Sequence, residues 1–196
     1  MMSDAAERFG RATDGFAARV DAVRRDQWQT QSPCPKWTVR DVTVHVINEA
    51  RRMLATVRQT EPESLYGVQV APMGELPETE PGADLPAAFR SIAAGLVAAI
   101  DDPTCRQVEL PTFAGPQPFA ELVDTLPEDV LIHTWDVARA TGGDERLDPE
   151  LVEYVFERFK PLDEMLRQPW AFGPKITPPE GADVQTQFLC FVGRLT

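Results

Sequence analysis

Apolar residues recur every three or four positions along several long stretches of the chain, which is the pattern of amphipathic α-helices. One such stripe runs through residues 4–26. Prolines gather outside these stretches, at 62–86, 103–118 and 169–179. Because an interior proline removes a hydrogen bond and clashes with the preceding turn, the stretches between the clusters are the helix candidates. The predicted helices, N-caps included, cover residues 4–26, 38–58, 85–100, 119–141 and 148–168.

Capping signals set two of the helix starts. Thr38 followed three residues later by Asp41 predicts a capping box at the start of the second helix. Pro127 interrupts the fourth stretch, and Thr125 with Glu128 reads as another capping box. We therefore expect a kink or a fresh helix start at that proline.

Other signals mark the remaining ends. Gly142 predicts the C-terminal stop of the fourth helix, and Asp148 predicts the N-cap of the fifth. A kink in that last helix is expected at Pro161. Weak alternation at 107–110, followed by a turn at 112–115, is compatible with a short strand or hairpin.

The pattern as a whole predicts an all-α fold. We expect one domain over residues 1–196, in which four helices share a core and a fifth helix packs outside it. Long proline-rich loops connect the helices, and a proline-rich tail follows the last one. This architecture is a four-helix bundle with an extra helix.

Charge and composition limit the classes of molecule that the protein is expected to bind. Acidic residues outnumber basic ones by 31 to 19, so the formal net charge is −12. This balance argues against binding to nucleic-acid phosphates or to an anionic membrane. The longest weakly apolar run, 92–100, is far shorter than the roughly 20 residues of a spanning helix. With no export signal and three scattered cysteines, we expect a cytoplasmic protein, either monomeric or homodimeric.

Three residues form a candidate metal site. Asp129 and His133 are four residues apart, so they share one face of the fourth helix. His45 lies midway along the second helix, and side-by-side packing of the two helices would bring all three together. Two imidazoles and one carboxylate leave a coordination position open, as catalytic metal sites do. A satisfied core histidine and a surface ion pair explain the same spacing.

Five further residues have two interpretations each. Asp136 either hydrogen-bonds a metal ligand or caps a neighbouring helix, and Trp135 is either core or a pocket wall. Cys34, between two prolines, is either a structural residue in a rigid turn or a reactive thiol. Arg51 and Arg52 either remain solvated or receive an anionic substrate.

The same residues carry a family resemblance. Residues 32–42, SPCPKWTVRDV, with His45 following, resemble a segment of the mycothiol-dependent maleylpyruvate isomerase N-terminal family. Residues 129–142, DVLIHTWDVARATG, resemble its second signature, and 172–174 and 191–194 resemble two C-terminal elements of a branch of that family. The family belongs to the DinB-like metal-binding four-helix superfamily.

The resemblance implies a DinB-like bundle and assigns the metal ligands to His45, Asp129 and His133. The resemblance to the isomerase itself is incomplete in two respects. The isomerase uses Glu where this chain has Asp129, which brings the ion closer to the helix backbone and changes metal preference. The isomerase also has a substantial C-terminal domain, whereas little more than a tail follows the fifth predicted helix here.

Three functions are compatible with these residues. The first is a metal-dependent enzyme that uses a low-molecular-weight thiol, of which mycothiol is the one that the family suggests, for isomerisation or conjugation of an electrophilic substrate. The second is a metal-dependent hydrolase, and the third is a non-catalytic metal-binding or sensing module. Zinc is the expected cofactor, with nickel, iron and cobalt as alternatives.

Overall fold

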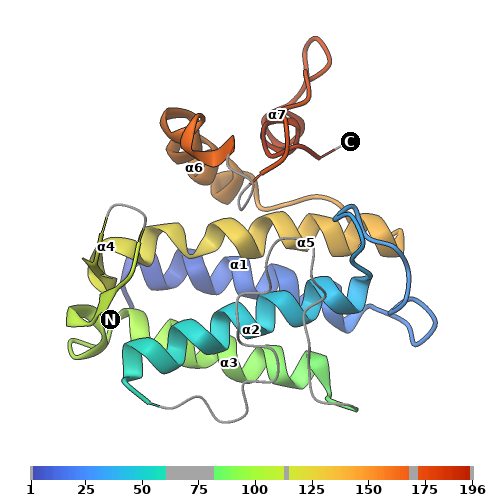
Figure 1. The fold of residues 1–196 in the computed structure, drawn as a ribbon. Helices are drawn as coiled ribbons and strands as arrows, with labels where there is room; N and C mark the ends of the chain where they lie inside the picture. Colours follow the sequence, from blue (N-terminus) through green and yellow to red (C-terminus); the bar gives the residue numbers. More distant parts are fainter. Residues whose placement is uncertain (1, 61–81, 113–114, 168–171, 195–196) are drawn as a thin grey trace.

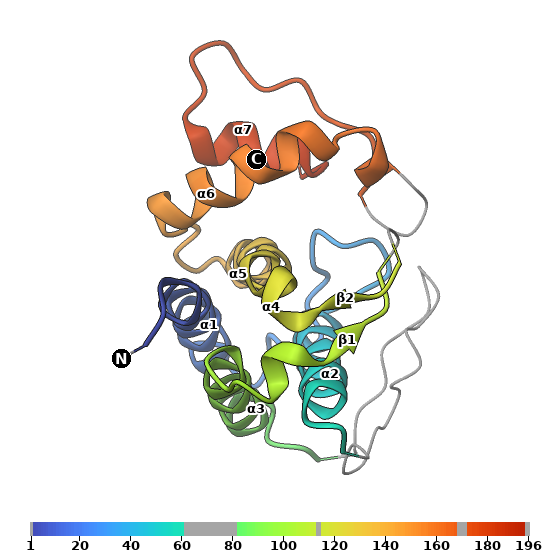
Figure 2. The same cartoon turned by 90° about the vertical axis from the view of Figure 1, so that its left-hand side faces the viewer.

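Four long helices form a bundle in the computed structural model, which describes residues 2–60, 82–112, 115–167 and 172–194. In Figure 2 the bundle is seen along its axis, with α1 and α2 each lying between α3 and α5. The bundle helices are α1 (Asp4–Asp21), α2 (Val39–Arg58), α3 (Leu85–Ile100) and α5 (Pro127–Thr141). The expected all-α, DinB-like architecture is therefore confirmed.

Large apolar side chains from all four helices meet along the bundle axis. Phe16 and Phe89 are almost fully buried, and their rings pack edge to face at 4.7 Å between centroids. Ile47 of α2 and Trp135 of α5 are buried in the same core. Trp135, at 1% exposure, is thus core and not a pocket wall. This packing fixes α2 and α5 side by side.

Local signals correctly predict most helix starts. Thr38 and Asp41 form the capping box, each side chain accepting from the other residue's backbone N–H. The helix at 85–100 has the predicted bounds, because Asp84 caps its first turn. The first helix ends at Asp21, five residues before the predicted end at residue 26. A turn begins directly after Asp21.

The fourth predicted stretch breaks as expected but without its capping box. A short α4 (Phe119–Leu122) and a 3-10 turn, η2 (Val123–Thr125), precede α5. Leu126 already has helical dihedrals, φ −56° and ψ −34°, so no extended N-cap residue exists there. The Thr125 hydroxyl instead donates to the Leu122 carbonyl, and the capping-box prediction was wrong.

The fifth predicted helix is shorter than expected. It is α6 (Pro149–Phe159), capped by Asp148, and continues as the 3-10 turns η3 (Lys160–Leu162) and η4 (Met165–Arg167). Pro161 lacks the N–H that an α-helical turn needs, which accounts for the change at that point. The last predicted residue, 168, lies outside the described residues.

A small antiparallel hairpin confirms the short strand signal. It pairs β1 (Glu109–Leu110) with β2 (Gln117–Pro118) and follows the 3-10 turn η1 (Cys105–Gln107). The expected turn falls partly on residues 113–114, which lie outside the described residues. Figure 2 shows the hairpin beside α2 and α4.

The C-terminal segment contains a helix that the sequence pattern missed. This helix, α7 (Val184–Phe191), is capped by Asp183 and packs on α6 through Phe156 and Phe188, whose ring centroids are 5.9 Å apart. We call residues 149–167 and 172–194 the C-terminal lobe. Figure 1 shows it on one side of the bundle, next to α5.

Two further features bear on the protein's surroundings and chemistry. Among the described residues, no helix combines the length and the apolar character required to cross a membrane. Cys34, Cys105 and Cys190 are all free thiols, and all three are buried.

Candidate metal centre

Two neighbouring helices bring the three predicted ligands together. Asp129 and His133 lie one turn apart on α5, and His45 faces them from α2. His45 Nε2 is 3.6 Å from Asp129 Oδ2, and His133 Nε2 is 3.3 Å from Asp129 Oδ1. The three donor atoms all lie within 4.8 Å of one another. Helix packing therefore produces the convergence that sequence spacing allowed but could not establish.

The cluster is open on one side. The Asp129 side chain is 51% exposed, that of His45 25%, and that of His133 only 8%. Solvent therefore reaches the carboxylate first and the deeper imidazole last. A small molecule would approach from the Asp129 side.

An indole ring covers another side of the cluster. The Trp37 ring centroid is 4.9 Å from that of His45 and 6.4 Å from that of His133. Trp37 directly precedes Thr38, so the capping box that starts α2 also places the indole. The cluster thus combines polar donors with one aromatic wall.

Asp136 orients the deeper histidine. Its carboxylate Oδ2 lies 2.9 Å from His133 Nδ1, and its side chain is fully buried. When Nδ1–H donates to this carboxylate, Nε2 is the nitrogen that faces Asp129 and His45. Of the two predicted roles, Asp136 therefore has the hydrogen bond to a candidate ligand.

Arg194 holds Asp136 from the end of the chain. Its Nε and Nη2 donate to the two carboxylate oxygens of Asp136 at 2.8 and 2.7 Å. The Arg194 side chain is only 14% exposed, so this is a buried, two-pronged ion pair. Sequence reasoning noted the motif at 191–194 but assigned Arg194 no role.

Cys34 closes the same network. Its thiol donates to Asp136 Oδ2 at 3.2 Å, and its sulfur accepts from Arg194 Nη2 at 3.3 Å. Cys34, His133 and Asp136 could hold an ion by spacing alone. The guanidinium already supplies the positive charge at that carboxylate, however, so a second cation would be repelled. The cluster around Asp129 is the better candidate.

The charges of the cluster favour a cation between the helices. Desolvation opposes ionisation of Asp129, but attraction to His133 and His45 outweighs it and holds the Asp129 pKa well below its ordinary value. Desolvation likewise opposes protonation of His133, but Asp129 and Asp136 raise its pKa well above 6.5. A metal ion bound by the three donor atoms would satisfy the same negative charges.

The donor set and its spacing fit a divalent transition metal. Donors about 2.1 Å from a tetrahedral ion are about 3.4 Å apart. The separations of 3.6 and 3.3 Å in the cluster match that value closely. Two imidazole nitrogens and one carboxylate oxygen suit zinc, nickel, iron or cobalt.

The two arginines considered as substrate contacts have ordinary surroundings. Arg52 forms an ion pair with Glu49 on the same helix and is 41% exposed. Arg51 is partly exposed. Both belong to α2 beyond His45, and no described contact joins either guanidinium to the cluster.

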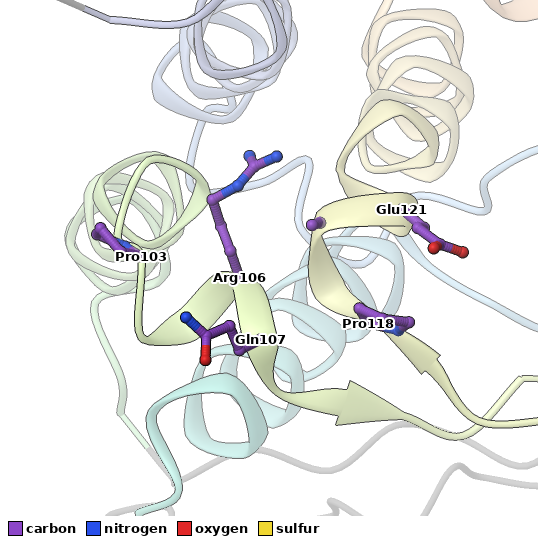
Figure 3. A pocket seen from close by; sticks show the side chains of 6 residues that line it. Pro103, Arg106, Gln107, Pro118 and Glu121 are labelled. Atoms are coloured by element: carbon purple, nitrogen blue, oxygen red, sulfur yellow. The ribbon is translucent and has the colours of Figure 1, made fainter.

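A separate surface cleft lies between η1, β2 and α4. Figure 3 shows Arg106, Gln107 and Glu121 among its lining residues, together with Pro103 and Pro118. The Arg106 guanidinium is partly engaged, because its Nη1 donates to the Ile100 carbonyl at 3.1 Å. None of the three candidate ligands lines this cleft, so it is not an extension of the cluster.

Comparison with known proteins agrees with the helical fold. Residues 9–138 match the family model of the mycothiol maleylpyruvate isomerase N-terminal domain. The chain is 32% identical over 141 residues to an uncharacterized protein found in two strains of Mycobacterium tuberculosis, covering 72% of this chain and 69% of that protein. No solved structure matches this chain. A helical bundle with this match over most of its length belongs to the mycothiol maleylpyruvate isomerase N-terminal domain family, within the DinB-like superfamily.

Proposed function

We propose that the protein binds one divalent metal ion through His45, Asp129 and His133 and uses it to hold a low-molecular-weight thiol of the mycothiol type. The convergence of the three donor atoms within 4.8 Å carries this proposal. Three protein ligands leave a position for an exogenous ligand, as in catalytic zinc sites. Zinc is the expected metal, with nickel, iron or cobalt as alternatives.

The charge of the cluster suits a thiolate. A divalent cation bound there would stabilise the thiolate form of a thiol as a Lewis acid. Asp129 contributes one negative charge and the two neutral imidazoles none, so an anionic sulfur would bring the local charge to zero. The exposed side of Asp129 gives the thiol access, and Trp37 offers an apolar face.

Such a site would support addition chemistry. The thiolate sulfur would add to a carbon–carbon double bond conjugated with an electron-withdrawing group. A C–S bond would form, the π electron pair would move onto that group, and the remaining single bond could rotate. Elimination of the thiolate then completes cis–trans isomerisation, whereas protonation of the adduct by solvent completes conjugation. The electrophilic substrate is thus an activated alkene.

Zinc titration by calorimetry, with elemental analysis of untagged protein, tests the metal assignment. We expect one equivalent of zinc in the wild type and none in His45→Ala. Glu49→Gln is the matched control, because Glu49 is a carboxylate one turn further along α2 that pairs with Arg52 outside the cluster. Equal zinc binding by wild type and His45→Ala would contradict the assignment.

Cobalt-loaded protein separates thiol chemistry from its alternatives. Added mycothiol or N-acetylcysteine is expected to produce a thiolate-to-cobalt charge-transfer band and to lower the apparent pKa of the thiol. An unchanged spectrum and thiol titration would refute the thiol role. Ester hydrolysis without thiol would then support the hydrolase, and the absence of both would support a binding module.

A further inference from the structure

A chain of buried contacts connects the C-terminal lobe to the candidate metal centre. Arg194 follows α7 and reaches across to α5, where it pairs with Asp136 at 2.7 and 2.8 Å. Asp136 in turn bonds His133 Nδ1 at 2.9 Å. The far nitrogen of that ring is a proposed metal ligand. Figures 1 and 2 show α7 on the α5 side of the bundle.

We propose that Arg194 is a positioning residue that couples docking of the C-terminal lobe to metal affinity at the cluster. This inference rests on the proposed metal site. Arg194 touches no candidate ligand directly. It acts through Asp136, which selects the tautomer and the orientation of His133.

The burial of Asp136 explains why Arg194 is needed. Its side chain has no solvent exposure, so its charge depends on the groups around it. Without the guanidinium, the remaining partners are one imidazole and one thiol. The guanidinium holds both carboxylate oxygens at once, so without it the carboxylate can turn away from His133 Nδ1. His133 then loses the acceptor that directs its Nε2 toward the ion.

Linkage makes the effect reciprocal. If docking of the lobe strengthens metal binding by some factor, metal binding must strengthen docking by the same factor. Loss of a residue that orients a metal ligand typically weakens metal affinity about 10- to 100-fold. The same factor should therefore appear as a smaller opening equilibrium constant of α7 when metal is bound, which is measured as slower amide exchange.

A second set of contacts docks the lobe without involving Asp136. Gln185 on α7 accepts from the Leu147 N–H at 2.8 Å and donates to the Glu145 carbonyl at 2.9 Å. Gln185→Ala therefore removes a docking contact but keeps the Arg194–Asp136 pair. It is the matched control for a general loosening of the lobe.

The experiment measures zinc affinity and hydrogen exchange of the α7 amides in the full chain. In the wild type, we expect zinc to slow exchange of Val184–Phe191. Arg194→Met is expected to bind zinc about 10- to 100-fold more weakly, and zinc should no longer slow α7 exchange. Gln185→Ala should bind zinc within about twofold of wild type, because it leaves His133 oriented.

Arg194→Lys keeps the charge but loses the two-pronged geometry, so its zinc affinity should fall between wild type and Arg194→Met. It also provides the test if Arg194→Met does not fold. Wild-type affinity in both Arg194 variants, or α7 exchange independent of zinc, would overturn the coupling alone. A wild-type chain that binds no zinc would overturn the proposed metal site and this inference together.

Discussion

The buried pair of Arg194 and Asp136 should dominate the stability of the metal-free protein. Breaking a buried ion pair by removing one partner typically costs about 3 to 5 kcal/mol, because an uncompensated charge stays behind. His133 lies 2.9 Å from Asp136 in the wild type, and its proximity should keep part of the charge balanced when Arg194 is replaced. We therefore expect Arg194→Met to lower the free energy of unfolding by about 3 kcal/mol, the lower end of that range.

A double-mutant cycle isolates the pair. Asp136→Asn preserves the shape and an acceptor for His133 but strands the guanidinium, and should cost about 2 kcal/mol because Arg194 retains some access to solvent. The double variant leaves neither charge stranded. It should lose about 3 kcal/mol rather than the sum of the two, a coupling of about 2 kcal/mol.

Urea denaturation followed by far-ultraviolet circular dichroism, with a chelator present, measures these free energies. Arg146→Met is the control, because Arg146 pairs with Asp144 at 2.9 Å but its side chain is 88% exposed. That variant should lose much less stability than Arg194→Met, because solvent screens an exposed ion pair. If Arg194→Met loses no more than this control, or if the double variant equals the sum, the argument from burial is refuted.

Three further changes test the fold around the cluster, each by urea denaturation. Thr38→Ala removes the N-cap of the helix that carries His45 and should cost about 1 kcal/mol; no measurable loss would contradict the observed capping box. Gly142→Ala places a side chain at φ +66° and should cost about 1 kcal/mol, whereas a gain in stability would rule out the left-handed cap. Desolvation raises the pKa of the Asp124 carboxyl, but the hydrogen bond from Arg8 outweighs it, so that pKa lies below its ordinary value. Its stabilising effect is thus present above about pH 4 and lost as the pH falls further, so Asp124→Asn should flatten the acid limb of the stability profile.

Local signals predict the parts of the fold that local interactions determine. The start of α2 follows from Thr38 and Asp41, which form the capping box through their own side chains and backbone. The pairing of Asp129 with His133 follows from helical periodicity alone. Their meeting with His45 required the resemblance to a known family, because only tertiary packing brings α2 beside α5.

Long-range contacts explain what the sequence pattern missed. Arg194 and Asp136 are 58 residues apart, and nothing near either residue indicates the other. Helix α7 is short, and its stability depends on packing against Phe156 of α6 rather than on its own periodicity. Its Asp183 cap was the available local signal, and neighbouring prolines obscured it.

The burial of all three cysteines simplifies any assay of thiol dependence. Cys34, the one beside the candidate centre, is engaged by Asp136 and Arg194 and is only 9% exposed. A thiol-specific colorimetric reagent should therefore give almost no background signal with the native chain. Thiol reactivity observed with the folded protein can then be attributed to the small molecule supplied. Reaction of a protein cysteine with the reagent would indicate unfolding.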